Sequence, residues 1–331
     1  MTAIRSKTKM KSRATEGFII VGSVFLIILF LKNSTLAGAE VTSALKTCAL
    51  MLIPSLFPLT VASEIATETG AAEFVTRKLC TPISKILGVS KFAAVPYFLG
   101  LLGGYTSSCK SAVSLYKSGK ISHSDCERVI ALSNIPSLAF LTGFVGGKIF
   151  SNTTVGWILW GIAVISTLII GVISQILFDK NASSFSKFES DMTPQSTYSQ
   201  RKKSFSQIVV GAITQSAYSM LIVCACVVFF SVLIAVLKFT LTHLGLSNTQ
   251  GELLLGTLEI TRAVNSCLLI ENSIMRATLC AAYIGWSGLC VHFQVFALCE
   301  EANISFKKYI LLKALQGIIC ALLALVIFTL I

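Results

Sequence analysis

The chain has 331 residues, with a hydrophobic fraction of 54%, a charged fraction of 13% and a mean hydropathy of +0.80. Soluble domains carry about 25% charged residues, so this composition excludes a water-soluble fold. The net charge of +12 is typical of a membrane protein whose basic residues flank its spans and attract anionic lipid, and we do not expect nucleic-acid binding. The sequence therefore predicts an all-α polytopic membrane protein with about eight membrane-embedded segments.

The first predicted element is a short apolar helix over residues 17–32, with five basic residues before it. These basic residues predict a cytoplasmic N-terminus, because short loops rich in Lys and Arg stay on that side. The segment also imitates a secretory signal peptide, since Ala37-Gly38-Ala39 follows it. A retained first helix is our interpretation, and cleavage is the alternative. The five basic residues are Arg5, Lys7, Lys9, Lys11 and Arg13.

Further apolar stretches predict spans along the rest of the chain. An amphipathic stretch over 74–87 is expected to lie in the membrane interface. A Ser-rich polar linker, residues 179–206, divides the chain, and its basic run 201–203 predicts a cytoplasmic position. The predicted spans after the first cover residues 44–64, 129–150, 155–178, 207–238 and 309–331.

The two halves of the chain resemble each other. Phe98-Leu-Gly-Leu-Leu-Gly103 matches Tyr283-Ile-Gly-Trp-Ser-Gly288 at an offset of 185 residues, and a second match follows at an offset of 183 residues. With the N-terminus and the linker on one side, the two repeats enter the membrane from opposite sides, as in alternating-access carriers. The predicted parts are the N-terminus with the first transmembrane helix over 1–36, a first repeat over 37–178, the linker over 179–206 and a second repeat over 207–331.

Glycines and polar residues interrupt the apolar sequence in the first half, and such backbone is tolerated in a membrane only around an enclosed or watery cavity. Gly103 and Gly104 are expected to end one helix, and the hydroxyl-rich residues after them to begin the next. A helix N-terminus in a cavity attracts a carboxylate or phosphate, and Lys110 would add a full charge. A packing bend, with Lys110 reaching the interface, is the alternative. The candidate residues are Gly103, Gly104, Tyr105, Thr106, Ser107, Ser108 and Lys110, with Ser133 and Asn134 as a hinge, a cavity wall or a tolerated kink.

The second half holds a matching polar stretch. His292 binds substrate, relays a proton or bonds to a neighbouring helix; the sequence leaves these open. Upstream, Glu259 and Arg262 are three residues apart and can pair on one helical face. Either they line a pathway, or residues 247–262 form an interfacial helix and the pair is solvated. The candidate residues are Glu259, Thr261, Arg262, Gly285, Ser287, Gly288, His292 and Gln294.

The sequence contains no catalytic, nucleotide-binding or cofactor-binding motif. We therefore expect no enzyme, no cofactor and no metal. Most of the eleven cysteines lie in apolar stretches without a C-x-x-C pair, where cysteine behaves as a small hydrophobic residue. We expect no disulfides, and Cys109 is the one thiol that its polar surroundings predict to be reachable.

The order of these motifs resembles the YlbJ family of sporulation integral membrane proteins, within the nucleoside-recognition (gate) domain group. The resemblance covers about residues 40–325 and implies two gate-like repeats in a cytoplasmic-type membrane of a spore-forming bacterium, a spore-associated one in particular. It further implies a role in delivering dipicolinic acid to the developing spore. The matching motifs are Ile53-Pro-Ser-Leu-Phe-Pro58, Gly103-Gly104-Tyr105, Ser133-Asn134-x-Pro136, Leu258-Glu-Ile-Thr261 and Gly285–Gln294.

Together these features predict a carrier for a small organic anion, with dipicolinate as first choice. The anion is expected between the two broken segments, on the backbone N–H groups that follow Gly104 and Gly288, with Lys110 or Arg262 balancing its charge. His292 or Glu259 is expected to couple a proton, and another coupling ion is not excluded by the sequence. Two alternatives stay open: a carrier for a neutral nucleoside-like solute that contacts Asn134, Gln294 and Thr261, and a non-transporting scaffold of spore assembly.

Overall fold

The computed structural model describes residues 17, 20–178, 204–243, 245 and 247–331. This part of the chain is largely helical and has no β-strand, which confirms the predicted all-α fold. The basic N-terminal residues and most of the linker lie outside the described residues, so their cytoplasmic position stays a prediction. Shorter apolar helices occur at Ile20–Lys32 and Phe140–Ile149. Five helical stretches are long and apolar enough to cross a bilayer: Ser34–Glu68, Thr153–Ile176, Phe205–Lys238, Ser273–Leu298 and Phe306–Leu330.

The elements before the linker include two pairs of short helices that are broken by non-helical residues, α5 with α6 and α7 with η2. Two of the elements, η1 and η2, are π-helical. The elements are α2 (Ser34–Thr47), η1 (Cys48–Leu52), α3 (Ile53–Glu68), α4 (Ala71–Leu87), α5 (Ala94–Gly103), α6 (Tyr105–Lys117), α7 (His123–Ser133), η2 (Phe140–Ile149) and α8 (Thr153–Phe178).

The elements after the linker begin with the longest helix and again contain broken pairs, α10 with α11 and α12 with α13. The elements are α9 (Phe205–His243), α10 (Asn248–Gly256), α11 (Ile260–Ser266), the 3₁₀ turn η4 (Cys267–Leu269), α12 (Ser273–Trp286), α13 (Leu289–Leu298), the 3₁₀ turn η5 (Glu300–Ala302) and α14 (Phe306–Leu330).

Two predicted spans differ from the structure because of proline. The span predicted at 44–64 is part of a longer helical run that passes Pro54 through a π-helical turn. Proline lacks an N–H and disturbs the helical hydrogen-bond ladder, and the Ser55 hydroxyl here donates to the carbonyl of Met51 at 2.6 Å. The span predicted at 129–150 is wrong as a single helix, because α7 ends before Pro136 and the chain resumes in η2.

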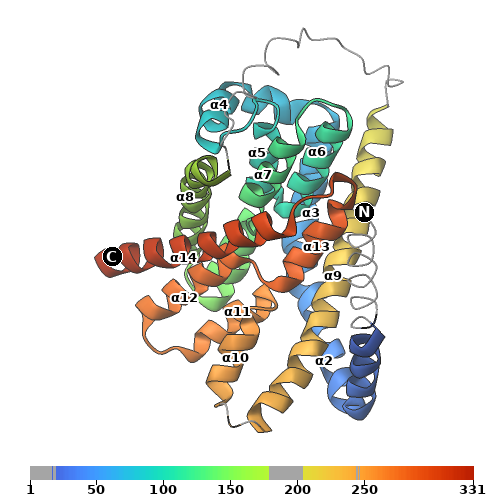
Figure 1. Ribbon diagram of the computed structural model, residues 1–331, viewed down its shortest axis with the longest axis vertical. Helices are drawn as coiled ribbons and strands as arrows, with labels where there is room; N and C mark the ends of the chain where they lie inside the picture. Colours follow the sequence, from blue (N-terminus) through green and yellow to red (C-terminus); the bar gives the residue numbers. More distant parts are fainter. Residues whose placement is uncertain (1–16, 18–19, 179–203, 244, 246) are drawn as a thin grey trace, which may run out of the picture.

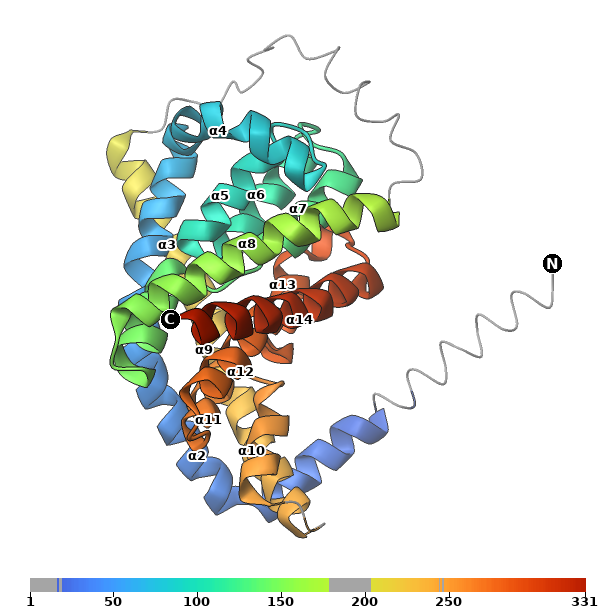
Figure 2. The same ribbon diagram turned by 90° about the vertical axis from the view of Figure 1, so that its left-hand side faces the viewer.

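The long helices run in two steeply crossing directions. The span within α9 has 34 residues, which at 1.5 Å per residue is about 51 Å, well beyond a hydrocarbon core of about 30 Å. Such a helix must tilt strongly or extend out of the membrane. In agreement, α9 and its neighbours α2 and α3 cross the direction of α8 and α14 (Figures 1 and 2).

Helix α14 has one face for lipid and one for the interior. Ile318, Leu322 and Val326 recur every four residues and are 57%, 58% and 58% exposed, the spacing of a single helical face. The side chains of Lys313 and Gln316 are buried on the other side. The helix packs there against α12, α8 and α7, so a helix of high average hydropathy hides a polar stripe.

Two glycines that separate broken helices, one in each half, adopt a similar unusual backbone conformation. Gly104 separates α5 from α6 with φ +80° and ψ −177°, and Gly288 separates α12 from α13 with φ +86° and ψ 148°. This region of backbone space is essentially restricted to glycine. The alignment of the two halves pairs Gly288 with Gly103, one residue before Gly104. The two repeats and their inverted orientation in the membrane stay predictions.

Replacing Gly288 by alanine is expected to destabilise the protein by about 1–3 kcal/mol, the cost of a backbone conformation that a side chain disfavours. A Cβ at this position would also lie 3.1 Å from the backbone nitrogen of Ile260. Gly161→Ala in α8 is the matched control, since a Cβ there meets nothing within 4 Å and helical alanine is preferred over glycine. The unfolding temperature in detergent measures both, and an equal effect of the two substitutions would contradict the expectation.

Candidate functional site

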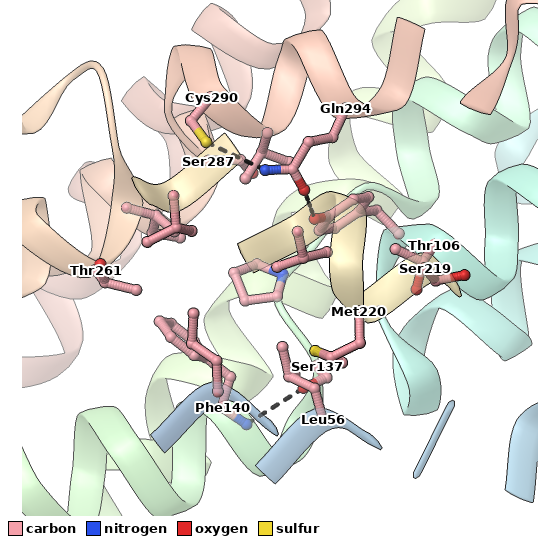
Figure 3. Close-up of a pocket in the computed structure, with 18 of the residues that line it drawn as sticks. Leu56, Thr106, Ser137, Phe140, Ser219, Met220, Thr261, Ser287, Cys290 and Gln294 are labelled. Atoms are coloured by element: carbon pink, nitrogen blue, oxygen red, sulfur yellow. Dashed lines mark hydrogen bonds between the residues drawn. The ribbon is translucent and has the colours of Figure 1, made fainter. Parts of the chain in front are cut away.

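A cavity lies where the broken helices of the two halves meet, and we call it the central cavity (Figure 3). Its volume of about 60 Å³ is enough for a few water molecules. Apolar side chains such as Leu56, Phe140 and Met220 form much of its wall. The residues that contribute polar side chains are Thr60, Tyr105, Thr106, Asn134, Ser137, Ser219, Glu259, Thr261, Ser287, Cys290 and Gln294.

The two glycine-broken segments touch across this cavity. The Tyr105 hydroxyl, one residue after Gly104, donates to the side-chain oxygen of Gln294 in α13. The Gln294 amide group in turn donates to the sulfur of Cys290 at 3.1 Å (Figure 3). Segments that are 189 residues apart in the chain therefore form one wall.

About half of the candidate residues predicted from the sequence line the central cavity. Among the others, Ser108 and Ser133 bond to each other through their hydroxyls. Gly285 lets α12 approach α14 closely, since a Cβ there would lie 2.7 Å from the Gln316 carbonyl oxygen. The predicted residues that line the cavity are Gly103, Gly104, Tyr105, Thr106, Asn134, Glu259, Thr261, Ser287 and Gln294; those that do not are Ser107, Ser108, Lys110, Ser133, Arg262, Gly285, Gly288 and His292.

The two helices that start after the glycines differ in what their first amides do. In α13, Leu289 N–H donates to the carbonyl of Thr257 at 3.1 Å, and Cys290 N–H to that of Leu258 at 2.8 Å. The break before α13 is thus paired with the break before α11, and these amides are not free for an anion. In α6, within the described residues, the amides of 105–107 have no such partner, and this helix start borders the cavity.

Glu259 is the one charged residue among those that line the central cavity, and it is 1% exposed. Its carboxylate caps the start of α11, accepting the backbone N–H of Thr261 at 2.9 Å and of Arg262 at 2.8 Å, together with the Thr261 hydroxyl. A helix N-terminus stabilises a carboxylate through its free amides and its dipole. The buried negative charge is therefore held by α11 itself.

A second, larger cavity lies on the other side of Glu259, and we call it the vestibule. It is more open than the central cavity, with a volume of about 520 Å³. Val227, Glu259 and Thr261 line both spaces. These three residues therefore form a partition between the vestibule and the central cavity.

A chain of ion pairs crosses the vestibule. Instead of pairing with the Glu259 side chain as predicted, the Arg262 guanidinium lies 3.2 Å from Glu252 and 3.4 Å from Glu40. Lys238 also pairs with Glu252, at 2.6 Å. The network ties α10 and α11 to α2 and α9, and it contains two cations and two anions whose charges balance.

Lys110 is one turn beyond the start of α6 and does not itself line the central cavity, although Ser219, which its ammonium contacts, does. Its ammonium lies 3.3 Å from Glu64 in α3 and 3.3 Å from the carbonyl of Gln215 in α9, and it also donates to the Ser219 hydroxyl. In this position Lys110 joins three helices.

The prediction that Cys109 is a reachable thiol is wrong, because this side chain is 0% exposed.

A buried polar cluster behind the cavity joins the predicted residues His292 and Asn134 to Tyr309 and Lys313, which the sequence analysis missed. The His292 ring nitrogen Nδ1 lies 3.1 Å from the Tyr309 hydroxyl, which also accepts the side-chain amide of Asn134. His292 thus bonds to a neighbouring helix, one of the roles left open above. Lys313 binds the Asn134 carbonyl. A lysine inside an apolar span is costly and signals function, so its presence within 309–331 was the available signal.

Comparisons with known proteins give one informative similarity, since no family model and no solved structure matches the chain. The sequence is 25% identical over 300 residues to the sporulation integral membrane protein YlbJ of Bacillus subtilis (strain 168). The alignment covers 82% of this chain and 72% of that protein. The similarity supports the predicted relationship to YlbJ and agrees with the several apolar helices of an integral membrane protein. Membership of the gate-domain group stays a prediction.

Arg262→Met is expected to destabilise the protein by about 1–3 kcal/mol, because it leaves the largely buried Glu40 without its cation and Glu252 with one cation in place of two. Lys117→Met is the control, because it removes a cation from a solvent-exposed pair with Glu301, and such pairs contribute little. Thermal unfolding in detergent measures the difference. A midpoint for Arg262→Met that equals that of the control would show that the vestibule network does not hold α10 and α11 in place.

Proposed function

We propose that this chain is a membrane carrier that moves a small organic anion, with dipicolinate as first choice, during spore formation. The central cavity supports this proposal, because it lies between broken helices and because hydroxyl and amide side chains stand among the mainly apolar residues that line it. Broken helices around a buried site are the usual construction of secondary transporters. The similarity to a sporulation membrane protein supports the setting, and we propose transport rather than catalysis.

The start of α6 is the proposed seat for a carboxylate. Its first amides carry partial positive charge and border the cavity without an internal partner in the described part of the chain. Thr106, Ser137 and Ser219 also line the cavity (Figure 3). The Ser219 hydroxyl already donates to the Gln215 carbonyl at 2.9 Å, whereas those of Thr106 and Ser137 can donate to the second carboxylate of a dicarboxylic acid.

The partition of Val227, Glu259 and Thr261 is the proposed gate. The cavity of about 60 Å³ is smaller than an aromatic dicarboxylate, so the conformation described here is occluded and the cavity must widen to admit cargo. Movement of α10 and α11 away from α2 and α9 would join the cavity to the vestibule and require the Arg262–Glu40 and Lys238–Glu252 pairs to open. Protonation of Glu259 during this movement would lower the repulsion of an anion and couple a proton to transport.

A neutral, nucleoside-like solute is the second candidate, and two observations favour it. The charged residue of the cavity wall, Glu259, is an acid that repels anions. The side-chain oxygen Oδ1 of Asn134 is buried without a partner in the described residues, and such an acceptor suits a ligand that donates a hydrogen bond. This candidate keeps the same cavity and gate.

Purified protein in proteoliposomes is expected to take up radiolabelled dipicolinate, and unlabelled dipicolinate is expected to compete better than its uncharged diamide or uridine. Thr106→Val should lower uptake about tenfold by removing a hydroxyl beside the proposed anion seat. Glu259→Gln should tighten dipicolinate binding, because it removes a repelling charge. Lys117→Met, on an exposed ion pair, serves as the control and should leave uptake unchanged.

Stronger competition by uridine than by dipicolinate would contradict the proposal that the cargo is an anion, and it would favour a neutral solute. Weaker dipicolinate binding by a stably folded Glu259→Gln protein would contradict the electrostatic role given to this residue. Absence of uptake and binding for all three compounds, in a protein still required for spore formation, would favour the scaffold.

A further inference from the structure

A fully buried lysine lies directly behind the wall of the central cavity. Lys313 in α14 is 0% exposed. Its ammonium group donates to the backbone carbonyl of Asn134 at 2.6 Å and to the side-chain oxygen of Gln316 at 2.6 Å. Since Asn134 lines the cavity, a single residue stands between the ammonium and the cargo space.

The ammonium has no carboxylate partner within the described residues. Both of its hydrogen-bond acceptors are neutral oxygens, whereas the other buried or half-buried cations described above pair with glutamates. A buried charge without a counter-charge is expensive and is retained where it has a function. The nearby polar side chains of α8 and α13 are Ser166 and His292, and neither is a carboxylate.

The surrounding contacts fix the position of Lys313. The side-chain oxygen of Gln316 accepts a hydrogen bond from the ammonium, and its amide group donates to the Ser166 hydroxyl of α8 at 3.2 Å. Asn134 is held on its other side by the Tyr309 hydroxyl of α14. The carbonyl of Asn134 is available to Lys313 because α7 ends at Ser133 and the helical hydrogen-bond ladder stops there.

We infer that Lys313 is the counter-charge that selects anionic cargo in the central cavity, acting through Asn134 rather than by direct contact. This inference rests on the proposed anion transport. In a low-dielectric interior a charge acts over more than one residue, because the surroundings screen it weakly. Lys313 opposes the repulsion from Glu259. Its positive charge, unlike those of Lys110 and Arg262, is not balanced by a glutamate within the described residues.

Equilibrium binding to purified protein in detergent tests the inference, with dipicolinate and its uncharged diamide, pyridine-2,6-dicarboxamide, as probes. Lys313→Met should weaken dipicolinate binding about tenfold or more and change diamide binding little. Lys313→Arg, which keeps the charge, should retain most of the dipicolinate affinity. Lys117→Met controls for loss of a distant positive charge and should bind both probes like the wild type.

Gln316→Glu is a second variant that keeps Lys313 and does not line the cavity. It places a carboxylate of nearly the same shape beside the Lys313 ammonium. The ion pair then has no net charge, so it no longer attracts an anion in the cavity. Dipicolinate affinity should fall as in Lys313→Met, again with little change for the diamide. This variant decides the matter if Lys313→Met does not fold, as judged by thermal unfolding.

The outcomes separate the inference from the proposed function. If folded Lys313→Met, or Gln316→Glu, binds dipicolinate as tightly as the wild type does, Lys313 is not the counter-charge. The proposed anion transport would still stand. An equal loss of dipicolinate and diamide binding would also overturn it, because that pattern indicates a general structural role. A wild-type protein that binds neither probe would contradict the proposed anion cargo and this inference together.

Discussion

Backbone hydrogen bonding inside the membrane is the constraint on which this structure depends. Each helix break releases amides and carbonyls that hydrocarbon cannot satisfy, and the breaks before α11 and α13 satisfy each other. The amides that begin α13 pair with the carbonyls of Thr257 and Leu258, and the carbonyl left at the end of α7 binds Lys313. The start of α6 is different. Its first amides have no such partner among the described residues and border the central cavity, which is why a ligand is expected there.

Charge is distributed around the cavity in three layers. Glu259 lies in the wall, Lys313 lies one residue behind the wall, and the balanced ion pairs of Arg262 lie in the vestibule. A cargo anion would therefore be repelled by Glu259, which a proton can neutralise, and attracted by Lys313. Opening of the partition would alter the interaction with Glu259 and leave the interaction with Lys313 in place.

Sequence reasoning found the breaks at Gly104 and Gly288 because glycine and the residues after it carry a local signal. It could not place Lys110, because the partner of that ammonium is Glu64 on another helix, and only tertiary structure brings the two together. Lys313 was overlooked because hydropathy averages a single charge into an apolar span. Pairing of α13 with the break before α11 was likewise invisible, since backbone-to-backbone contacts leave no mark in side-chain pattern.

The central claim is that the two glycine-broken segments together enclose the cargo. Electron cryo-microscopy of the protein in lipid nanodiscs, with dipicolinate at saturating concentration, tests it most directly. We predict ligand density in a widened cavity between the start of α6 and Gln294, with one carboxylate on the α6 amides. Density confined to the vestibule, or a cavity that stays closed and empty while the ligand is bound elsewhere, would contradict the account.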